Sequence, residues 1–175
     1  MTRKLHIGGK IKAEGWEILN AVPAPEVDHI CNANDLSLFE NNTFDEIYAS
    51  HVLEHFDYNG ELQRTLKEWY RVLKPKGKLY VSVPDLDILA QLILEKKQLS
   101  ITERFHIMRI IFGGHVDQYD YHYVGLNQEF LADILYSTGF IQLIRVQHFG
   151  LFNDTSDLTF KGVNISLNII AEKPQ

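Results

Sequence analysis

Short apolar segments that end in glycine or in polar residues recur along the first half of the chain. Four of them are predicted β-strands, and a fifth, which is more apolar, is predicted to be a buried strand. They span residues 4–7, 17–19, 27–31, 45–49 and 78–83. The links between the first three strands are shorter than the crossovers that parallel strands usually need. Either these crossovers are bare loops or one strand is misassigned.

The apolar period changes after the fourth segment. Leu62, Leu66, Trp69 and Leu73 recur at helical spacing, which predicts an amphipathic helix with Asn59 as its N-cap. The Lys-Pro-Lys-Gly sequence that follows is expected to end this helix.

The second half of the chain begins with two predicted helices, over residues 86–97 and 102–112. Residues 113–123, GGHVDQYDYHY, follow as a loop rich in aromatic residues and histidine. A further helix is predicted from an N-cap at Asn127 to Gly139 in the C′ position. Its inward residues are expected to be Phe130, Leu131, Ile134 and Leu135.

Two closing strands are expected at residues 141–147 and 163–171. The alternation in VNISLNIIA is typical of an edge or hairpin strand. An exposed closing strand can pair across a two-fold axis, so a homodimer is one expectation.

Composition narrows the class of protein. With 175 residues and 45% apolar content, the chain is expected to form one domain over residues 1–175. A net charge of −6 and the lack of a Lys/Arg stripe argue against nucleic acid as a partner. No apolar run is long enough to cross a membrane. A single cysteine, Cys31, fits a reducing compartment, so a cytoplasmic protein is expected.

The strongest chemical signal is the sequence DEIYASHVLEH, residues 45–55. An apolar strand stops there at Ser50, His51, Glu54 and His55. In open α/β sheets, ligands bind outside the carboxyl ends of strands. Asp85 follows the next strand and is expected on the same rim, so these residues predict a ligand site.

Several segments occur in an order that resembles the class I S-adenosylmethionine-dependent methyltransferases, in particular the small ones of methyltransferase type 11. The resemblance covers nearly the whole chain, and its most specific part is the pair FDEIYASHVLEHF and RVLKPKGKLYVSVP. The other segments are LHIGG, GWEILNA, NANDL and GGHVDQYDYHY.

The resemblance implies an α/β, Rossmann-like fold with a mostly parallel seven-stranded sheet, reduced first helices and an antiparallel closing strand. It also implies S-adenosyl-L-methionine as cofactor, held by a glycine loop after the first strand. Two amides, Asn20 and Asn32, stand where the family usually places acids, and Asp35 is favoured for the adenine amino group. The cofactor-binding residues expected are Ile7, Gly8, Gly9, Asn20, Asn32, Asp35, Leu36, Ser50 and His51.

The expected reaction is methyl transfer to a small molecule that bears a hydroxyl, carboxyl or amine, with a sugar or glycan precursor preferred. Histidine suits a general base near neutral pH. The catalytic candidates are His115, His51 and Asp85. The loop is expected to form the lid and acceptor pocket through Asp117, Tyr119, Tyr121, His122 and Tyr123.

Two alternatives stay open at this point. The amides and the shortened glycine loop are also compatible with a non-catalytic binding or assembly module of the same fold. His51 to His55 spells H-x-x-E-H, a zinc-hydrolase signature, with Glu129 as a conceivable third ligand. The break in the chain just after the motif argues against this hydrolase, so no metal is expected.

Overall fold

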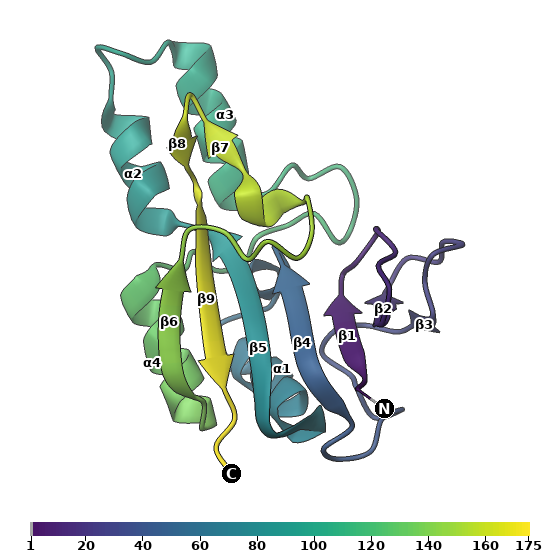
Figure 1. Ribbon diagram of the computed structural model, residues 1–175. Coiled ribbons are helices and arrows are strands. Elements are labelled where there is room, and N and C mark those ends of the chain that lie inside the picture. The colour runs from purple at the N-terminus through teal and green to yellow at the C-terminus, as the bar shows by residue number, and fades with distance from the viewer. Residues whose placement is uncertain (1) are drawn as a thin grey trace.

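The computed structural model describes residues 2–175, and its main element is a seven-stranded sheet of order β3-β2-β1-β4-β5-β9-β6 (Figure 1). Strand β9 is antiparallel to both of its neighbours, and the other neighbouring pairs are parallel. The predicted fold class is therefore confirmed. The strands are β1 (Lys4–Ile7), β2 (Trp16–Asn20), β3 (His29–Ile30), β4 (Phe44–Ser50), β5 (Leu73–Pro84), β6 (Ile141–Val146) and β9 (Ser166–Glu172).

The last strand lies inside the sheet, between β5 and β6, so its predicted edge position is wrong. Its alternation arises because Leu167 and Ile169 pack in the main core, whereas Asn168 points to the opposite face. Asn168 is also buried, and its side-chain amide donates to two backbone carbonyls. The preceding Val163–Asn164 is a separate strand, β8, which pairs with β7 (Thr159–Phe160) in a small hairpin. The other predicted closing strand, β6, forms this edge of the sheet.

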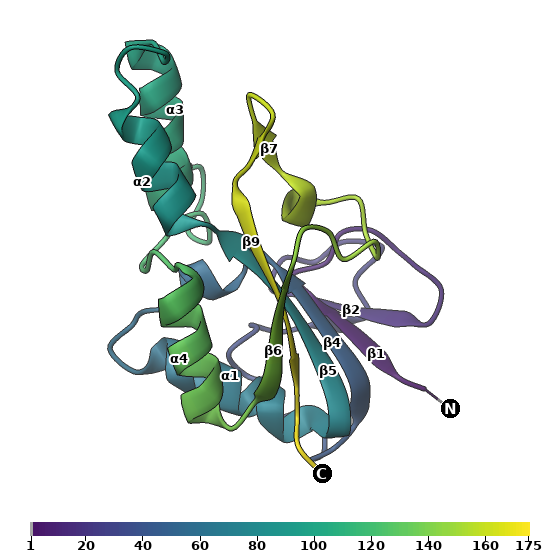
Figure 2. The same cartoon turned by 60° about the vertical axis from the view of Figure 1, so that its left-hand side comes forward.

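The first three crossovers are bare loops, over residues 8–15, 21–28 and 31–43. This confirms the predicted reduction of the first helices. Its consequence is visible in Figure 2: helices α1 (Glu61–Val72) and α4 (Gln128–Thr138) cover one face of the sheet. Over residues 2–175, no α-helix covers the opposite face of β1, β2 and β4.

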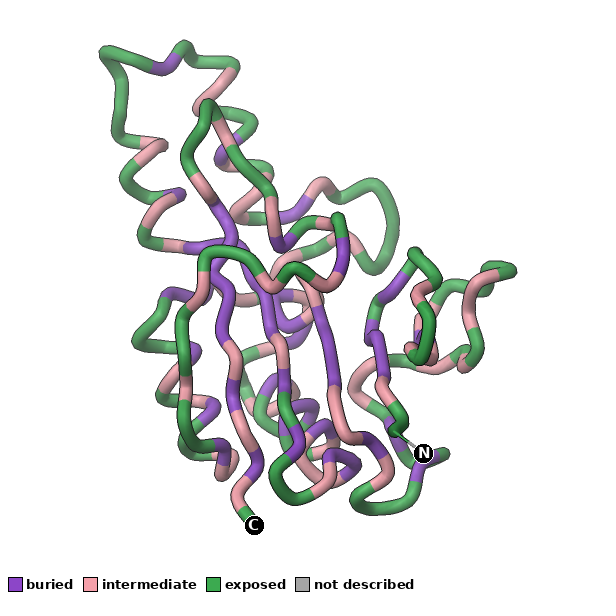
Figure 3. The backbone as a smooth tube through the Cα atoms, in the orientation of Figure 1, coloured by how far each residue is buried: buried purple, intermediate pink, exposed green. Residues whose placement is uncertain are grey.

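Helix α1 carries the predicted apolar face. Leu62, Leu66 and Trp69 are buried, and the Trp69 indole N–H donates to the carbonyl of Ala33 at 2.8 Å. The predicted cap at Asn59 is wrong, because the N-cap is Gly60 with a left-handed φ of 109°. Figure 3 shows the buried backbone running through the central strands and the inner side of these helices.

Helix α4 begins after Asn127, whose side chain accepts from the backbone N–H of Phe130, and ends at Gly139 as predicted. Leu131 and Leu135 are buried, but Phe130 is 52% exposed, so its predicted inward position is wrong.

Helices α2 (Leu86–Leu94) and α3 (Ile101–Phe112) project beyond the carboxyl edge of the sheet together with the β7–β8 hairpin (Figure 1). They share a small separate core, in which Leu89, Ile107 and Ile165 are buried. Helix α2 ends three residues earlier than expected, before a turn that leads to the Ser100–Glu103 capping box of α3. Within residues 2–175, none of the helices is both long and apolar enough to span a bilayer.

An aromatic cluster takes the place of a helix on the other face of the sheet. The His6 ring lies 4.9 Å from Tyr48 and 4.2 Å from Phe152, measured between ring centroids. Tyr48 donates its hydroxyl to Asp154 at 2.9 Å, which fixes the segment that carries Phe152. His6 is only 4% exposed, and its Nδ1 has no hydrogen-bond partner among residues 2–175.

This burial predicts an acid-sensitive contribution to stability. Desolvation lowers the pKa of His6 from 6.5 to about 4, so protonation favours the unfolded chain. The neutral form contributes fully above about pH 6.5, and its contribution is lost as the pH falls toward about 4. We expect this loss to be roughly 2–3 kcal/mol, and His6→Phe to remove it.

Urea unfolding at a series of pH values tests this expectation. The exposed His106 provides the control, because His106→Phe makes the same exchange outside the cluster. If the His6→Phe protein loses stability between neutral and acid pH as steeply as the unchanged protein, the cluster does not act in this way.

Candidate functional site

The site is built where the strand order reverses, between β1 and β4. These strands are parallel neighbours, with Ile7 opposite Ala49, so their carboxyl ends emerge side by side. Gly8 follows β1 with a φ of +74°, and His51 follows β4 with a φ of +53°. A Cβ at Gly8 would lie 2.8 Å from Cγ2 of Val52. Only glycine allows this approach without displacing Val52.

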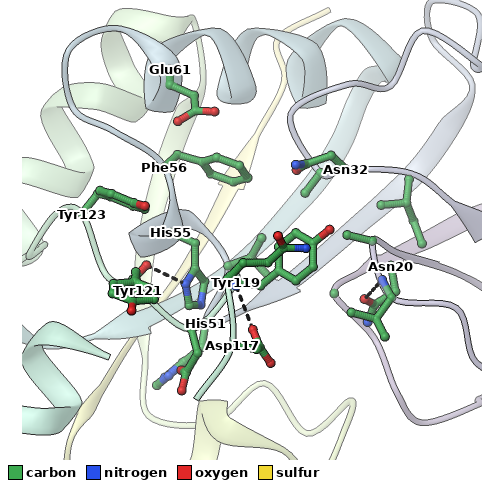
Figure 4. A pocket seen from close by; sticks show the side chains of 18 of the residues that line it. Asn20, Asn32, His51, His55, Phe56, Glu61, Asp117, Tyr119, Tyr121 and Tyr123 are labelled. Carbon is green, nitrogen blue, oxygen red and sulfur yellow. Dashed lines mark hydrogen bonds between the residues drawn. The ribbon is translucent and has the colours of Figure 1, made fainter. Parts of the chain in front are cut away.

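A pocket of about 710 Å³ opens above these strand ends (Figure 4). The tips of β4 and β5 are neighbours, as expected, but the pocket lies on the β1 and β2 side of β4. Its lining comes from the strand ends, the residues after them, the start of α1 and the loop 113–123. It comprises Gly8, Lys10, Leu19, Asn20, Ala21, Val22, Asn32, Ala33, His51, Val52, His55, Phe56, Asp57, Glu61, Val116, Asp117, Gln118, Tyr119, Asp120, Tyr121 and Tyr123.

Among the predicted glycine-loop residues, Gly8 lines the pocket. Ile7 is fully buried in the core, and Gly9 lies against the His6 ring, where a Cβ would be 2.7 Å from the ring. The loop is held by the backbone N–H of Gly8, which donates to the carbonyl of Leu19 at 2.8 Å.

Asn20 lines the pocket and also fastens the glycine loop. Its amide nitrogen donates to the carbonyl of Gly9 at 3.1 Å, and its oxygen accepts from the N–H of Val22 at 3.0 Å. A carboxylate here would face the Gly9 carbonyl without a proton to donate. The amide at position 20 therefore has a structural role: it holds the short glycine loop in place, which no helix does here.

At the end of β3, the structure separates the predicted residues. Asn32 lines the pocket, whereas Asp35 is exposed and accepts from the N–H of Ser37 in its own turn at 3.0 Å. Leu36 is fully buried in the main core, packed below the sheet edge. Of these three, only Asn32 is placed to contact a pocket ligand.

His51 is held firmly at the tip of β4. Its Nε2 donates to the hydroxyl oxygen of Ser166 at 2.9 Å, since that hydroxyl donates in turn to the carbonyl of Thr155 at 2.7 Å. Burial lowers the pKa of His51 to about 3. The neighbouring Ser50 lies outside the pocket lining, with its hydroxyl 2.8 Å from that of Thr155.

The loop 113–123 closes one side of the pocket and is tied to the short 3-10 helix η1 (Leu53–His55). The N–H of Tyr123 donates to the Glu54 carbonyl at 2.8 Å, and Nδ1 of His55 donates to the carbonyl of Tyr121 at 3.0 Å. Figure 4 shows the loop residues facing Asn20 and Asn32 across the pocket. The predicted loop residues that line it are Asp117, Tyr119, Tyr121 and Tyr123.

Two predicted loop histidines lie outside the lining. His115 stacks on Tyr121 with ring centroids 4.1 Å apart, and its Nε2 donates to the carbonyl of Phe112 at 2.8 Å. His122 contacts η1 instead, with its ring centroid 4.8 Å from that of His55. Both therefore order the loop in this structure.

Asp85 does not lie on the rim of the pocket as expected. Its carboxylate is buried, caps α2 and pairs with Arg145 at 2.8 Å. The sequence Pro-Asp-Leu joins the end of β5 to the start of α2, and the role of Asp85 as the N-cap accounts for the acid.

Sequence reasoning missed the acidic wall at the start of α1. Asp57 and Glu61 line the pocket, and Glu61 accepts from the Asn34 amide at 2.9 Å and from the N–H of Asp57 at 3.1 Å. With Asp117 and Asp120 on the loop, four carboxylates face a single cation, Lys10. The pocket is therefore suited to a ligand that carries positive charge.

The zinc-hydrolase geometry is not formed. His51 follows β4 and His55 ends a three-residue 3-10 helix, so the two histidines do not share a face of an α-helix. Glu129, the conceivable third ligand, lies exposed on α4.

Comparisons with known proteins agree with this architecture. The model of the methyltransferase domain family matches residues 17–81. A solved methyltransferase of Archaeoglobus fulgidus, described as S-adenosylmethionine-dependent, superposes with a TM-score of 0.61 at 15% identity and covers 98% of this chain and 86% of its own. The chain has the class I methyltransferase fold. The resemblance found in the sequence is confirmed.

Other solved methyltransferases share this fold. A Burkholderia thailandensis 1,6-didemethyltoxoflavin N1-methyltransferase with bound S-adenosylhomocysteine gives a TM-score of 0.58 at 14% identity, over 99% of this chain and 72% of that one. The CurJ carbon methyltransferase gives 0.60 at 18% identity. The superposition covers 99% of this chain but only 49% of the CurJ protein's length. A search of curated proteins finds no match.

The close approach at Gly8 yields a stability prediction with a matched control. Gly15 also has a positive φ, +77°, but a Cβ there would meet nothing within 4 Å. Gly15→Ala should therefore cost about 1 kcal/mol for the backbone conformation alone. Gly8→Ala should cost at least about 1 kcal/mol more, because Val52 must also move.

Chemical denaturation of both variants measures the two costs. Equal losses of unfolding free energy would show that Val52 does not restrict the glycine loop.

Proposed function

We propose that this chain binds S-adenosyl-L-methionine in the pocket above β1, β2 and β4 and transfers its methyl group to a small-molecule acceptor. The observation that carries the proposal is the position of the pocket. It lies at the strand-order reversal, against a glycine that no other residue can replace without strain.

The chemistry of the lining fits this cofactor. Gly8 leaves room for close contact, while the amides of Asn20 and Asn32 offer donors and acceptors to hydroxyl and purine groups. Phe56 adds an aromatic ring that points toward Asn32 (Figure 4). The excess of carboxylates over cations favours a sulfonium, which supplies an electrophilic methyl group when bound.

The loop 113–123 is the proposed acceptor side. Tyr119, Tyr121 and Tyr123 are each between 41% and 53% exposed and line the pocket. A tyrosine combines an apolar ring with a polar tip, and Asp117 adds an acceptor for hydroxyl or ammonium groups. This combination supports a small acceptor that bears a hydroxyl or an amine, with sugars among the favoured candidates.

The proposed rate enhancement comes mainly from positioning. Holding the acceptor in line with the methyl group and away from water can supply most of the acceleration in such a displacement. His51 and His115 remain the predicted bases. The pKa of about 3 makes His51 a weak proton acceptor, and the Nε2 proton of His115 points at a backbone carbonyl.

One observation favours the alternative, a non-catalytic module of the same fold. Asn20 already uses both ends of its amide on the backbone, which leaves less capacity for a ribose. In that case the cofactor would bind without turnover, or not at all.

Calorimetric titration with S-adenosylhomocysteine tests binding. Ala21 lines the pocket and Ala24 does not, although both lie in the loop after β2. Ala21→Phe should fill the pocket and weaken binding at least about tenfold, which is about 1.4 kcal/mol, whereas Ala24→Phe should leave it unchanged. An unmodified protein that does not bind either cofactor form would refute the proposal.

Turnover separates the enzyme from the module. Incubation with S-adenosylmethionine and a panel of small alcohols, amines and sugars should release S-adenosylhomocysteine with at least one acceptor. Tyr119→Ala should then raise KM for that acceptor more than it weakens cofactor binding, because Tyr119 belongs to the proposed acceptor side. Binding with no product across the panel would favour the module.

A further inference from the structure

Three side chains that could bind a metal ion lie close together beside the pocket. Glu54 and His55 belong to η1, and His122 belongs to the loop 113–123. One potential ligand atom from each of the three lies within 4.8 Å of the others. His55 also lines the pocket, so this group is adjacent to the proposed methyl-transfer site but distinct from it.

Glu54 is the unusual member. It is 1% exposed, and neither carboxylate oxygen has a hydrogen-bond partner among the residues from 2 to 175. Burial raises its pKa to about 8. Buried carboxyl groups are normally paired, hydrogen-bonded or bound to a metal, because an unpaired one is costly.

Each of the two histidines places one ring nitrogen within reach of the cluster. Nδ1 of His55 donates to the Tyr121 carbonyl at 3.0 Å, which leaves the lone pair of Nε2 available. Burial lowers the pKa of His122 to about 4, so its ring is neutral near pH 7. Histidines that bind metals are neutral and commonly donate their other N–H to a backbone carbonyl.

We propose that Glu54, His55 and His122 form a binding site for a divalent transition-metal ion of the zinc type. Two imidazoles and one carboxylate are a common three-ligand set for Zn²⁺, with water in the fourth position. Ligand atoms around tetrahedral zinc lie roughly 3.3–3.5 Å apart, so small side-chain rotations would complete the site. The ion would neutralise the buried carboxylate.

The site would have a mechanical consequence. It joins η1 to the loop 113–123, whose other links to η1 are hydrogen bonds from Tyr123 and His55 to backbone carbonyls. A bound ion would fix the position of the loop that walls the pocket. This inference does not depend on the proposed methyl transfer.

The competing explanation is a permanently protonated Glu54. Nδ1 of His51 lies 3.6 Å from Oε1 of Glu54, and a neutral carboxylic acid could donate there after a small movement. In that case the three side chains would form only a buried polar cluster and would not bind a metal ion.

The test uses the full chain after treatment with a chelator. Titration with Zn²⁺ should show one ion per chain, and Co²⁺ should give visible absorption bands of a nitrogen- and oxygen-ligated ion. Glu54→Gln keeps the shape of the side chain and should weaken binding at least about tenfold. His122→Asn should do the same, and Zn²⁺ should raise the melting temperature of the unchanged protein but not of these variants.

His148→Asn is the matched control. His148 is exposed and also faces a carboxylate, Asp157 at 2.8 Å, but it lies outside the cluster, so its removal should leave zinc binding intact. The proposal is overturned if the unchanged protein binds no stoichiometric zinc, or if folded Glu54→Gln and His122→Asn bind it as tightly as the unchanged protein. Ala21→Phe should still bind zinc, which separates this result from any failure of cofactor binding.

Discussion

The whole site depends on the contact between the backbone of Gly8 and the side chain of Val52. Parallel pairing of β1 with β4 sets the two strand ends side by side, and the missing Cβ of Gly8 lets them meet. Gly8, His51 and Val52 all line the pocket, so this close approach lies at its floor. A larger residue at position 8 would have to displace Val52 at the floor of the pocket.

The absence of helices from the first crossovers changes what holds this floor. Asn20 fixes the glycine loop through two backbone hydrogen bonds, and the aromatic cluster around His6 covers the sheet face that has no helix. The segment carrying Phe152 closes that cluster through the Tyr48–Asp154 hydrogen bond. The chain thereby keeps the strand order of the class I methyltransferase fold with less secondary structure on one face.

Most of the fold could be predicted because it follows local patterns. Residues close together in sequence determine the strand ends, the apolar face of α1 and the caps at Asn127 and Gly139. The interior position of β9 could not be predicted, since its alternating pattern resembles that of an edge strand. The burial of Leu36 and the exposure of Phe130 likewise depend on how distant segments pack.

The site was predictable only in part for the same reason. Gly8, Asn32 and His51 follow strands directly, so a rule about strand ends finds them. Asp85 follows the same rule but serves as a helix cap. Glu61 lines the pocket from a helix, so a rule about strand ends cannot find it. The pairing of His122 with Glu54 joins residues far apart in sequence, and no spacing in the chain indicates it.

The most direct measurement is a crystal structure of the chain with S-adenosylhomocysteine. The ligand should lie across the ends of β1 and β4, with its sulfur near Gly8 and His51 and its nucleoside on the side of Asn32 and Phe56. A ligand bound elsewhere, or strand ends that move apart to admit it, would contradict the role assigned to the Gly8–Val52 contact.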